Sequence, residues 1–145
     1  FGVAGAGAHT PAPDASPLRV MSVEAVLTFL LMLVIAPVAT DKRTGAAVAP
    51  LAIGFMVVVN VLIGGAVTGG SMNPARSLAP ALLAGGAPLA AWWQYAVGTV
   101  SGAVAAAVMY EKLLRPVAAQ QFAQSVPANI GDPAALLSEC AAPVE

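Results

Sequence analysis

The chain has 145 residues, of which 59% are hydrophobic and only 9% are charged, and its formal net charge is −1. Soluble domains usually carry about 25% charged residues, so this composition excludes an ordinary soluble domain and predicts a membrane protein. The net charge gives no reason to expect nucleic acid as a partner. The single cysteine, Cys140, cannot build a disulfide framework or a zinc site. Because the chain begins at Phe1 and not at Met, we expect it to be a fragment.

The predicted elements are apolar spans separated by short connections. Residues 1–20 are rich in Gly, Pro and Ala and predict an extracellular loop. We expect the lone histidine, His9, to be a solvated loop residue rather than a ligand. Residues 21–39 predict the first membrane-spanning helix and residues 47–66 the second, because about 20 apolar residues cross a bilayer as a helix.

The third span is predicted over residues 89–113, where Trp92, Trp93 and Tyr95 suggest an interfacial aromatic belt. Residues 114–145 are expected to form a tail. Basic residues lie between the first two spans and after the third (Lys42, Arg43, Lys112, Arg115). Two spans separate these sites, so both lie on one face, which the positive-inside rule makes cytoplasmic. We therefore expect a multi-pass protein in the lipid bilayer of the plasma membrane, with a cytoplasmic tail.

Residues 67–83 contain a predicted helix that is too short to form another membrane span. A helix over residues 74–83 would be about 15 Å long at about 1.5 Å per residue, half of a hydrocarbon core of about 30 Å. It is apolar nearly all round and has no broad polar face for water. We therefore expect a re-entrant loop and half-helix that dip into the membrane from outside.

The start of this half-helix carries an Asn-Pro pair and an arginine. Asn73 is a good N-cap and Pro74 suits the first helical position, which on the simplest interpretation is all that the pair does. Burying Arg76, however, costs at least about 2.5 kcal/mol, and charges at that depth mostly face water-filled paths or partners. Gly69 and Gly70 accept unusual backbone angles, so the preceding loop can present bare carbonyls. Together these features predict one wall of a pore.

The sequence TGGSMNPARSLAPAL, residues 68–82, resembles the second Asn-Pro-Ala loop of the aquaporin, or major intrinsic protein, family. VEAVLTF (23–29) resembles the family's fourth span, LAIGFMVVVNVLIGGAVTGGSMNPAR (51–76) its fifth span and re-entrant loop, and WWQYAVGTVSGAVAA (92–106) its sixth. The resemblance implies an all-α membrane protein, the second half of an aquaporin-like fold with three transmembrane helices and one re-entrant half-helix. It also implies a passive channel, not an enzyme, without cofactor or metal, and a homotetramer in the full-length form.

The resemblance also assigns roles to residues. The pore and its selectivity filter would be lined by Asn73, Pro74, Ala75, Arg76, Val61 and Gly70. The amide of Asn73 would donate hydrogen bonds to the solute, and Arg76 would repel cations. Acceptors would be the carbonyls of Gly69, Gly70, Ser71 and Met72. Glu24 would accept backbone N–H bonds from the re-entrant loop; the alternative is a carboxylate that reaches toward the membrane surface.

The filter residues also bear on the solute. Strict water channels of the family usually have His at the position of Val61, so Val61 with Gly70 would make a wider and less polar constriction; the alternative is a packing or lipid-facing valine. Ser77 stands where glycerol facilitators typically have Asp, and Ala81 replaces a basic residue. The resemblance is therefore strongest to the nodulin-like branch and its bacterial relatives. These pass glycerol and neutral metalloid hydroxides such as boric or arsenous acid.

Small and polar residues inside the spans predict helix contacts. We expect Asn60, beside Val61 but on another helix face, to make an interhelical hydrogen bond. Gly98 and Gly102 form a small-xxx-small face that would let the last span pack closely against another helix.

Two other functions stay open. The family builds its pore from two inverted halves, of which this chain holds the second, so we expect the chain alone not to conduct. Broken helices also bind ions in secondary transporters, and half of such a transporter would need another ionisable group near Arg76. The third possibility is a non-conducting membrane remnant or interaction subunit. A second Asn-Pro-Ala upstream in the gene would favour the channel.

Overall fold

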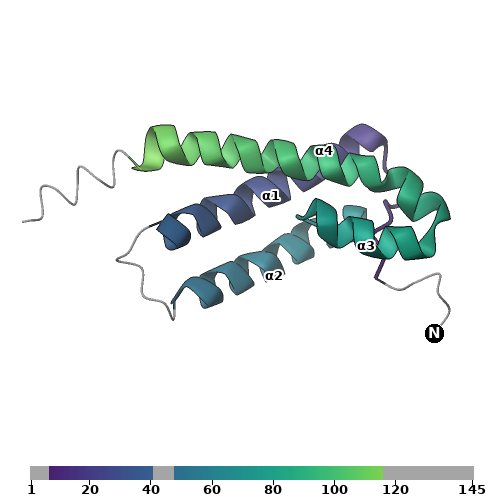
Figure 1. Ribbon diagram of the computed structural model, residues 1–145, viewed down its shortest axis with the longest axis horizontal. Helices are drawn as coiled ribbons and strands as arrows, with labels where there is room; N and C mark the ends of the chain where they lie inside the picture. The colour runs from purple at the N-terminus through teal and green to yellow at the C-terminus, as the bar shows by residue number, and fades with distance from the viewer. Residues whose placement is uncertain (1–6, 41–47, 116–145) are drawn as a thin grey trace, which may run out of the picture. The chain divides into compact units, whose positions relative to one another are not determined.

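The computed structural model describes residues 7–40 and 48–115, and within these ranges all regular structure is helical. The elements are α1 (Pro17–Thr40), α2 (Val48–Thr68), α3 (Pro74–Ala84) and α4 (Gly86–Met109), followed by a π-helical turn, η2 (Tyr110–Leu114) (Figure 1). Three stretches are long and apolar enough to cross a membrane, Pro17–Ala39, Val48–Thr68 and Gly86–Leu114. The predicted all-α membrane fold with three spans and one short helix is confirmed.

Two helices begin earlier than the sequence pattern indicates. α1 begins at Pro17, inside the segment 1–20 whose composition predicts a loop, because proline is accommodated in a first helical turn. The hydroxyl of Ser16 also accepts a hydrogen bond from the N–H of Arg19 at 3.3 Å. α4 begins at Gly86, directly after Gly85, and the positive φ of both glycines allows a tight reversal from α3.

Some sequence expectations lie outside the described residues. These are the predictions for residues 1–6, for the connection that holds Lys42 and Arg43, and for the tail from residue 116 onward. The orientation of the chain in the membrane therefore stays a prediction.

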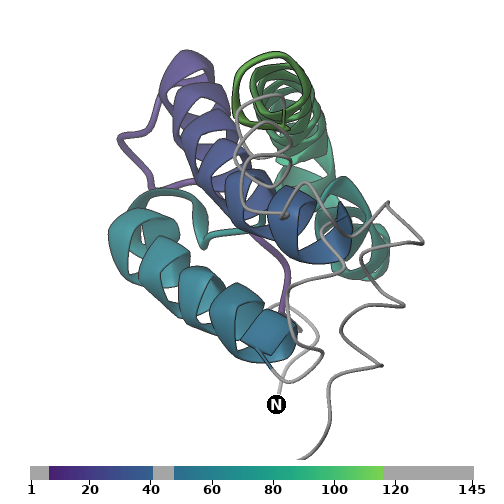
Figure 2. The same cartoon turned by 90° about the vertical axis from the view of Figure 1, so that its left-hand side faces the viewer.

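α1 contacts both α2 and α4, and α3 packs against α4 (Figure 2). α1 and α4 pack so closely that the backbone of α4 contacts the backbone of α1. A Cβ atom at Gly98 would lie 2.7 Å from the carbonyl oxygen of Met21, and one at Gly102 would lie 2.9 Å from the carbonyl carbon of Ala25. Real Cβ atoms essentially never come so close, so the predicted close packing through Gly98 and Gly102 is confirmed.

After α2 the chain turns back, so that α3 begins toward the middle of the bundle and runs outward to the turn before α4 (Figure 1). Positive φ angles make this reversal possible, 83° at Gly69, 65° at Gly70 and 55° at Met72. Glycine adopts these angles freely. Met72 has a Cβ, and a left-handed backbone costs such a residue about 1–2 kcal/mol. The surrounding contacts must hold Met72 in this conformation.

Many large apolar side chains are exposed and several polar side chains are buried, the opposite of the pattern in a soluble protein. Large apolar side chains on the outside of the helices are exposed, as with Phe55 at 70% and Leu62 at 79%, which suits contact with lipid. A small apolar cluster joins Val20, Ala91 and Tyr95. The buried polar residues are Glu24, Thr28, Asn60, Thr68, Ser71, Ser77 and Thr99. Because most of them lie in or against the re-entrant loop, the interior of the bundle holds that loop in place.

Internal contacts divide the chain into a unit of residues 1–110 and a second unit of residues 111–145. In the described part of the second unit, Nη1 of Arg115 donates to both carboxylate oxygens of Glu111, at 2.9 and 2.8 Å. All residues of the candidate site belong to the first unit.

Candidate pore wall

Asn73 caps α3 through its side chain. Its Oδ1 accepts hydrogen bonds from the N–H groups of Ala75 at 2.9 Å and Arg76 at 3.2 Å, and Pro74 occupies the first helical position. The amide group has one oxygen and two N–H donors. Because the cap uses the oxygen, the two donors remain for another partner. Asn73 is exposed, so these two N–H donors are accessible to a molecule outside the chain.

Glu24 holds the loop before α3. Its carboxylate is fully buried and accepts hydrogen bonds from the N–H of Ser71 at 3.0 Å and of Met72 at 2.8 Å. Two charge-assisted bonds to consecutive N–H groups fix the peptide planes of the loop. They also offset the strain at Met72.

The carbonyl groups of the loop have no partner in the chain as described. Hydrogen bonds within residues 7–40 and 48–115 do not reach the carbonyl oxygens of Gly69, Gly70, Ser71 or Met72. The N–H of Gly70 is bonded to the hydroxyl of Thr68 at 3.1 Å. The loop therefore directs its donors into the protein and leaves a row of acceptors for an outside partner.

α4 supplies two further anchors, Trp92 and Tyr95, for which the sequence predicts an aromatic belt. The indole Nε1 of Trp92 donates to the carbonyl of Pro74 at 2.9 Å, and the hydroxyl of Tyr95 donates to the carbonyl of Thr68 at 2.9 Å. The belt interpretation is wrong for Tyr95, which is fully buried, and for Trp92 it stays a prediction, since its indole is only partly buried while it bonds the re-entrant segment. Their i, i+3 spacing, which places both on one helix face, was the available signal. Trp93 is 47% exposed.

Asn60 ties α2 to α1, and the predicted interhelical hydrogen bond is confirmed. Its Nδ2 donates to the carbonyl of Leu27 at 2.8 Å and lies 3.1 Å from Sδ of Met72. The fully buried Asn60 therefore stabilises the helix pair and also contacts the loop.

The predicted filter residues fall into two neighbouring groups. A cavity of about 300 Å³ lies between α1, α2 and the loop, and its lining includes Ser71, Met72, Asn73 and Arg76. Val61 and Gly70 lie outside this lining but contact each other, since a Cβ atom at Gly70 would be 3.4 Å from Cα of Val61. The loop thus brings all the predicted wall residues into one region.

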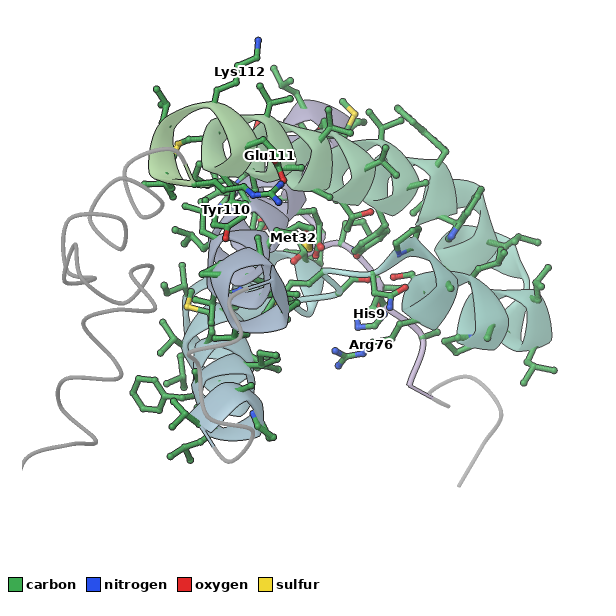
Figure 3. All side chains as sticks on the ribbon, turned by 60° about the vertical axis from the view of Figure 1, so that its left-hand side comes forward. His9, Met32, Arg76, Tyr110, Glu111 and Lys112 are labelled. Atoms are coloured by element: carbon green, nitrogen blue, oxygen red, sulfur yellow. The ribbon has the colours of Figure 1, made fainter. Side chains whose placement is uncertain are left out.

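Arg76 extends from the first turn of α3 and is exposed. It makes no ion pair with any residue in the described part of the chain. Figure 3 shows its guanidinium on the open side of the re-entrant segment. This position leaves the charge available to whatever enters the cavity that Arg76 lines.

His9 is placed differently from the expectation of a solvated loop residue. Its side chain is partly buried, with the ring 5.9 Å from that of Tyr95 and Nδ1 3.3 Å from the hydroxyl of Ser77. Burial and the nearby Arg76 guanidinium lower the pKa of the imidazole, while Glu24 opposes them. The sequence pattern does not indicate this placement, because the contact with Ser77 joins positions 68 residues apart.

Comparison with known proteins agrees with this architecture. Residues 2–110 match the family model described as Major intrinsic protein. The chain is 48% identical over 98 residues to aquaporin NIP1-1 of Zea mays, and the aligned region covers 68% of this chain and 34% of that relative. It is 46% identical over 98 residues to nodulin-26 of Glycine max, with 68% of this chain and 35% of the relative aligned. It is 44% identical over 98 residues to putative aquaporin NIP4-1 of Arabidopsis thaliana, with 68% of this chain and 34% of the relative aligned.

Three spans with one inward-turned half-helix define the class, a membrane protein with an aquaporin-like half-bundle. The chain belongs to the major intrinsic protein family, as the sequence motifs predicted. The aquaporins of this family are channels and not enzymes. The chain spans about a third of the length of the curated relatives it matches.

Proposed function

We propose that the chain forms the second half of a passive channel for water and small uncharged solutes. The observation that carries the proposal is the cavity of about 300 Å³ in which Asn73 and Arg76 meet the loop that Glu24 holds. This arrangement offers donors and acceptors along one wall and keeps a fixed positive charge beside them. A neutral molecule with hydroxyl groups can exchange its hydrogen bonds with water for bonds to such a wall.

In this function each part of the wall has a distinct task. The two N–H donors of Asn73 bind the oxygen of the passing molecule, and the loop carbonyls accept its hydroxyl protons. Arg76 repels cations, and the positive end of the α3 dipole adds to the barrier. This is the general account of aquaporin-type selectivity, applied to named residues of this chain.

The solute class follows from Val61 and Gly70. Their contact places a branched apolar side chain against a residue with no side chain, so that this side of the filter is wide and weakly polar. We propose glycerol and neutral metalloid hydroxides, such as boric and arsenous acid, as solutes besides water. Val61→Phe is expected to reduce glycerol and boric acid permeability several-fold. Val58→Phe, a matched change at a 55% exposed position of α2, leaves them unchanged.

A further part of the proposal concerns the complete channel. We propose that a preceding first half completes the pore, and that the full-length protein is a homotetramer of the plasma membrane with its tail in the cytoplasm. The chain alone then does not conduct. The apolar residues exposed on the helices support a membrane location.

The channel is favoured over half of a secondary transporter because of Glu24. Its carboxylate is fully buried, accepts loop N–H groups at both oxygens and does not line the cavity with Arg76, so it does not face a coupling ion there. A non-conducting remnant differs from a channel only in its permeability, which the following experiment measures.

The test is stopped-flow light scattering of proteoliposomes with water, glycerol and boric acid. We expect the full-length protein to equilibrate these solutes faster than empty vesicles, and the chain alone to behave as empty vesicles do. Full-length protein that passes none of the three at a verified density in the membrane would refute the channel. Rapid flux through the chain alone would refute the requirement for a first half.

A further inference from the structure

Within the described residues, the α1 wall of the cavity carries one polar side chain. The cavity of about 300 Å³ is lined from α1 by Thr28, Leu31, Met32 and Ile35. These positions follow one another by one to four residues and lie 0, 3, 4 and 7 places along the helix, so they share one face. Thr28 also lies one turn after Glu24, the residue that holds the re-entrant loop. A hydroxyl group is thus placed near the loop on a strip that is otherwise apolar.

The hydroxyl oxygen of Thr28 is buried and has no hydrogen-bond partner in the part of the chain that the structure describes. Thr28 as a whole is only 5% exposed. The other threonines that are buried among the described residues each donate to the carbonyl four residues earlier, Thr68 to Gly64 at 3.3 Å and Thr99 to Tyr95 at 2.7 Å. Such a bond is common for threonine inside a helix. Thr28 does not make it, and a buried hydroxyl without a partner is unfavourable.

The other polar side chains that line the cavity come from the re-entrant segment, and their free groups are donors. Oδ1 of Asn73 caps α3, which leaves the two N–H groups of that amide. Arg76 has only donors. The Ser71 hydroxyl donates to the carbonyl of Asn73 at 2.8 Å and contacts the hydroxyl of Ser77. Among the described lining residues, Thr28 is therefore the side chain whose oxygen is free both to accept and to donate a hydrogen bond.

Thr28 can present this oxygen to the cavity by turning about χ1. In the observed conformation the oxygen is covered, although the residue lines the cavity. Threonine divides between two χ1 rotamers in a helix, and no hydrogen bond from the described residues holds the hydroxyl of Thr28 in either. A solute that offers a partner can therefore draw the hydroxyl toward itself without breaking an existing bond.

We propose that Thr28 is a further specificity-determining residue, whose hydroxyl turns into the cavity and bonds a second hydroxyl group of a solute that Asn73 holds. This inference rests on the proposed channel function and says which solutes the cavity favours. Glycerol and boric acid have several hydroxyl groups and can use both positions at once, whereas water has a single oxygen. Each bond to the wall replaces one that the solute loses with water. Thr28 thus raises the permeability of polyhydroxyl solutes relative to that of water.

The first measurement asks whether the Thr28 hydroxyl has a partner inside the folded chain. Thr28→Val nearly keeps the shape of the side chain and removes the hydroxyl, so in detergent micelles it should unfold at the wild-type temperature or above it. The matched control is Thr68→Val, which should unfold at a lower temperature, because the Thr68 hydroxyl accepts the N–H of Gly70 at 3.1 Å and its loss leaves a buried donor unpaired. A Thr28→Val chain that fails to fold, or melts as low as Thr68→Val, would overturn the proposal, whatever the protein transports.

The second measurement compares water, glycerol and boric acid permeability of the full-length protein in proteoliposomes. Thr28→Val is expected to lower glycerol and boric acid permeability several-fold and water permeability much less, because only the polyhydroxyl solutes lose a second bond. Thr28→Ser keeps the hydroxyl and should retain the wild-type ratio of glycerol to water permeability. The control for removing a hydroxyl elsewhere is Ser101→Ala, since the Ser101 hydroxyl bonds the carbonyl of Gly98 in its own helix at 2.9 Å and lies outside the cavity lining. It should behave as the wild type does.

The outcomes separate the role of Thr28 from the channel itself. Unchanged permeability ratios in Thr28→Val, or an equal fall for all three molecules, would overturn the role of Thr28 and leave the channel intact. A Thr28→Ser protein that behaves as Thr28→Val does would show that side-chain shape decides and not the hydroxyl, and would overturn it as well. Wild-type protein that passes none of the three molecules would overturn the channel and this inference together.

Discussion

The sharpest prediction concerns Glu24, whose carboxylate accepts the N–H groups of Ser71 and Met72 at 3.0 and 2.8 Å. Glu24→Gln preserves the size of the side chain but leaves one acceptor oxygen. The second loop N–H then meets the amide NH₂, another donor, and loses its partner. An unsatisfied buried donor costs about 1–3 kcal/mol, so Glu24→Gln destabilises the loop by that amount. Glu24→Ala leaves both N–H groups unpaired and costs roughly twice as much.

The loop is expected to respond before the helices do. Met72 is held at a φ of 55°, a conformation that costs about 1–2 kcal/mol. With one N–H bond lost, relaxation at Met72 offsets part of the cost, and the loop moves from its position. The contacts between α1 and α4 do not involve the carboxylate, so the spans stay packed.

The assay uses Trp92, because its Nε1 donates to the carbonyl of Pro74 at 2.9 Å and reports where the loop lies. Trp93→Phe removes the other tryptophan, so that excitation beyond the tyrosine absorption band reports on Trp92 alone. In detergent, Glu24→Gln should shift the Trp92 emission and lower the temperature at which it changes, while helical circular dichroism melts later. The control is Glu111→Gln, since Glu111 is an exposed partner of Arg115 and exposed pairs contribute little. Identical Trp92 emission and melting in the two Glu→Gln variants would show that Glu24 does not hold the loop.

Two further predictions concern helix packing. Gly102→Ala places a methyl group 2.9 Å from the carbonyl carbon of Ala25, so α1 and α4 must separate, at a cost of about 1–3 kcal/mol in thermal unfolding. Gly54→Ala, where the structure leaves open space, serves as its control, and an equal effect of both changes would contradict the backbone contact. Asn60→Leu removes the hydrogen bond to the carbonyl of Leu27, and such bonds between membrane helices average about 0.6 kcal/mol with a maximum near 1.7. SDS titration of the helicity measures this loss, and an unchanged midpoint would show that the bond contributes nothing.

Local sequence determined the elements of this protein. The uncharged apolar runs determined three spans, because a backbone in lipid must satisfy its own hydrogen bonds. The Asn-Pro pair determined the start of α3 through a cap that needs only neighbouring residues. The sequence pattern does not indicate the start of α1 at Pro17, because proline suits both a loop and the first turn of a helix. The residues alone do not decide whether the Glu24 carboxylate reaches the membrane surface or bonds the re-entrant loop. The resemblance to the family implies the bonds to the loop, and the structure contains them.

Only the tertiary structure decided which distant residues meet the loop. Trp92 and Tyr95 have apolar bodies and polar tips, which suit a membrane interface and a buried hydrogen bond equally well. The partners of these tips lie 18 and 27 residues away in the chain. His9 reaches Ser77 across 68 residues, from a segment whose composition predicts only a loop. Periodicity and capping describe interactions over a few residues, whereas these contacts exist because α4 and the segment before α1 both pack against the re-entrant segment in the folded chain.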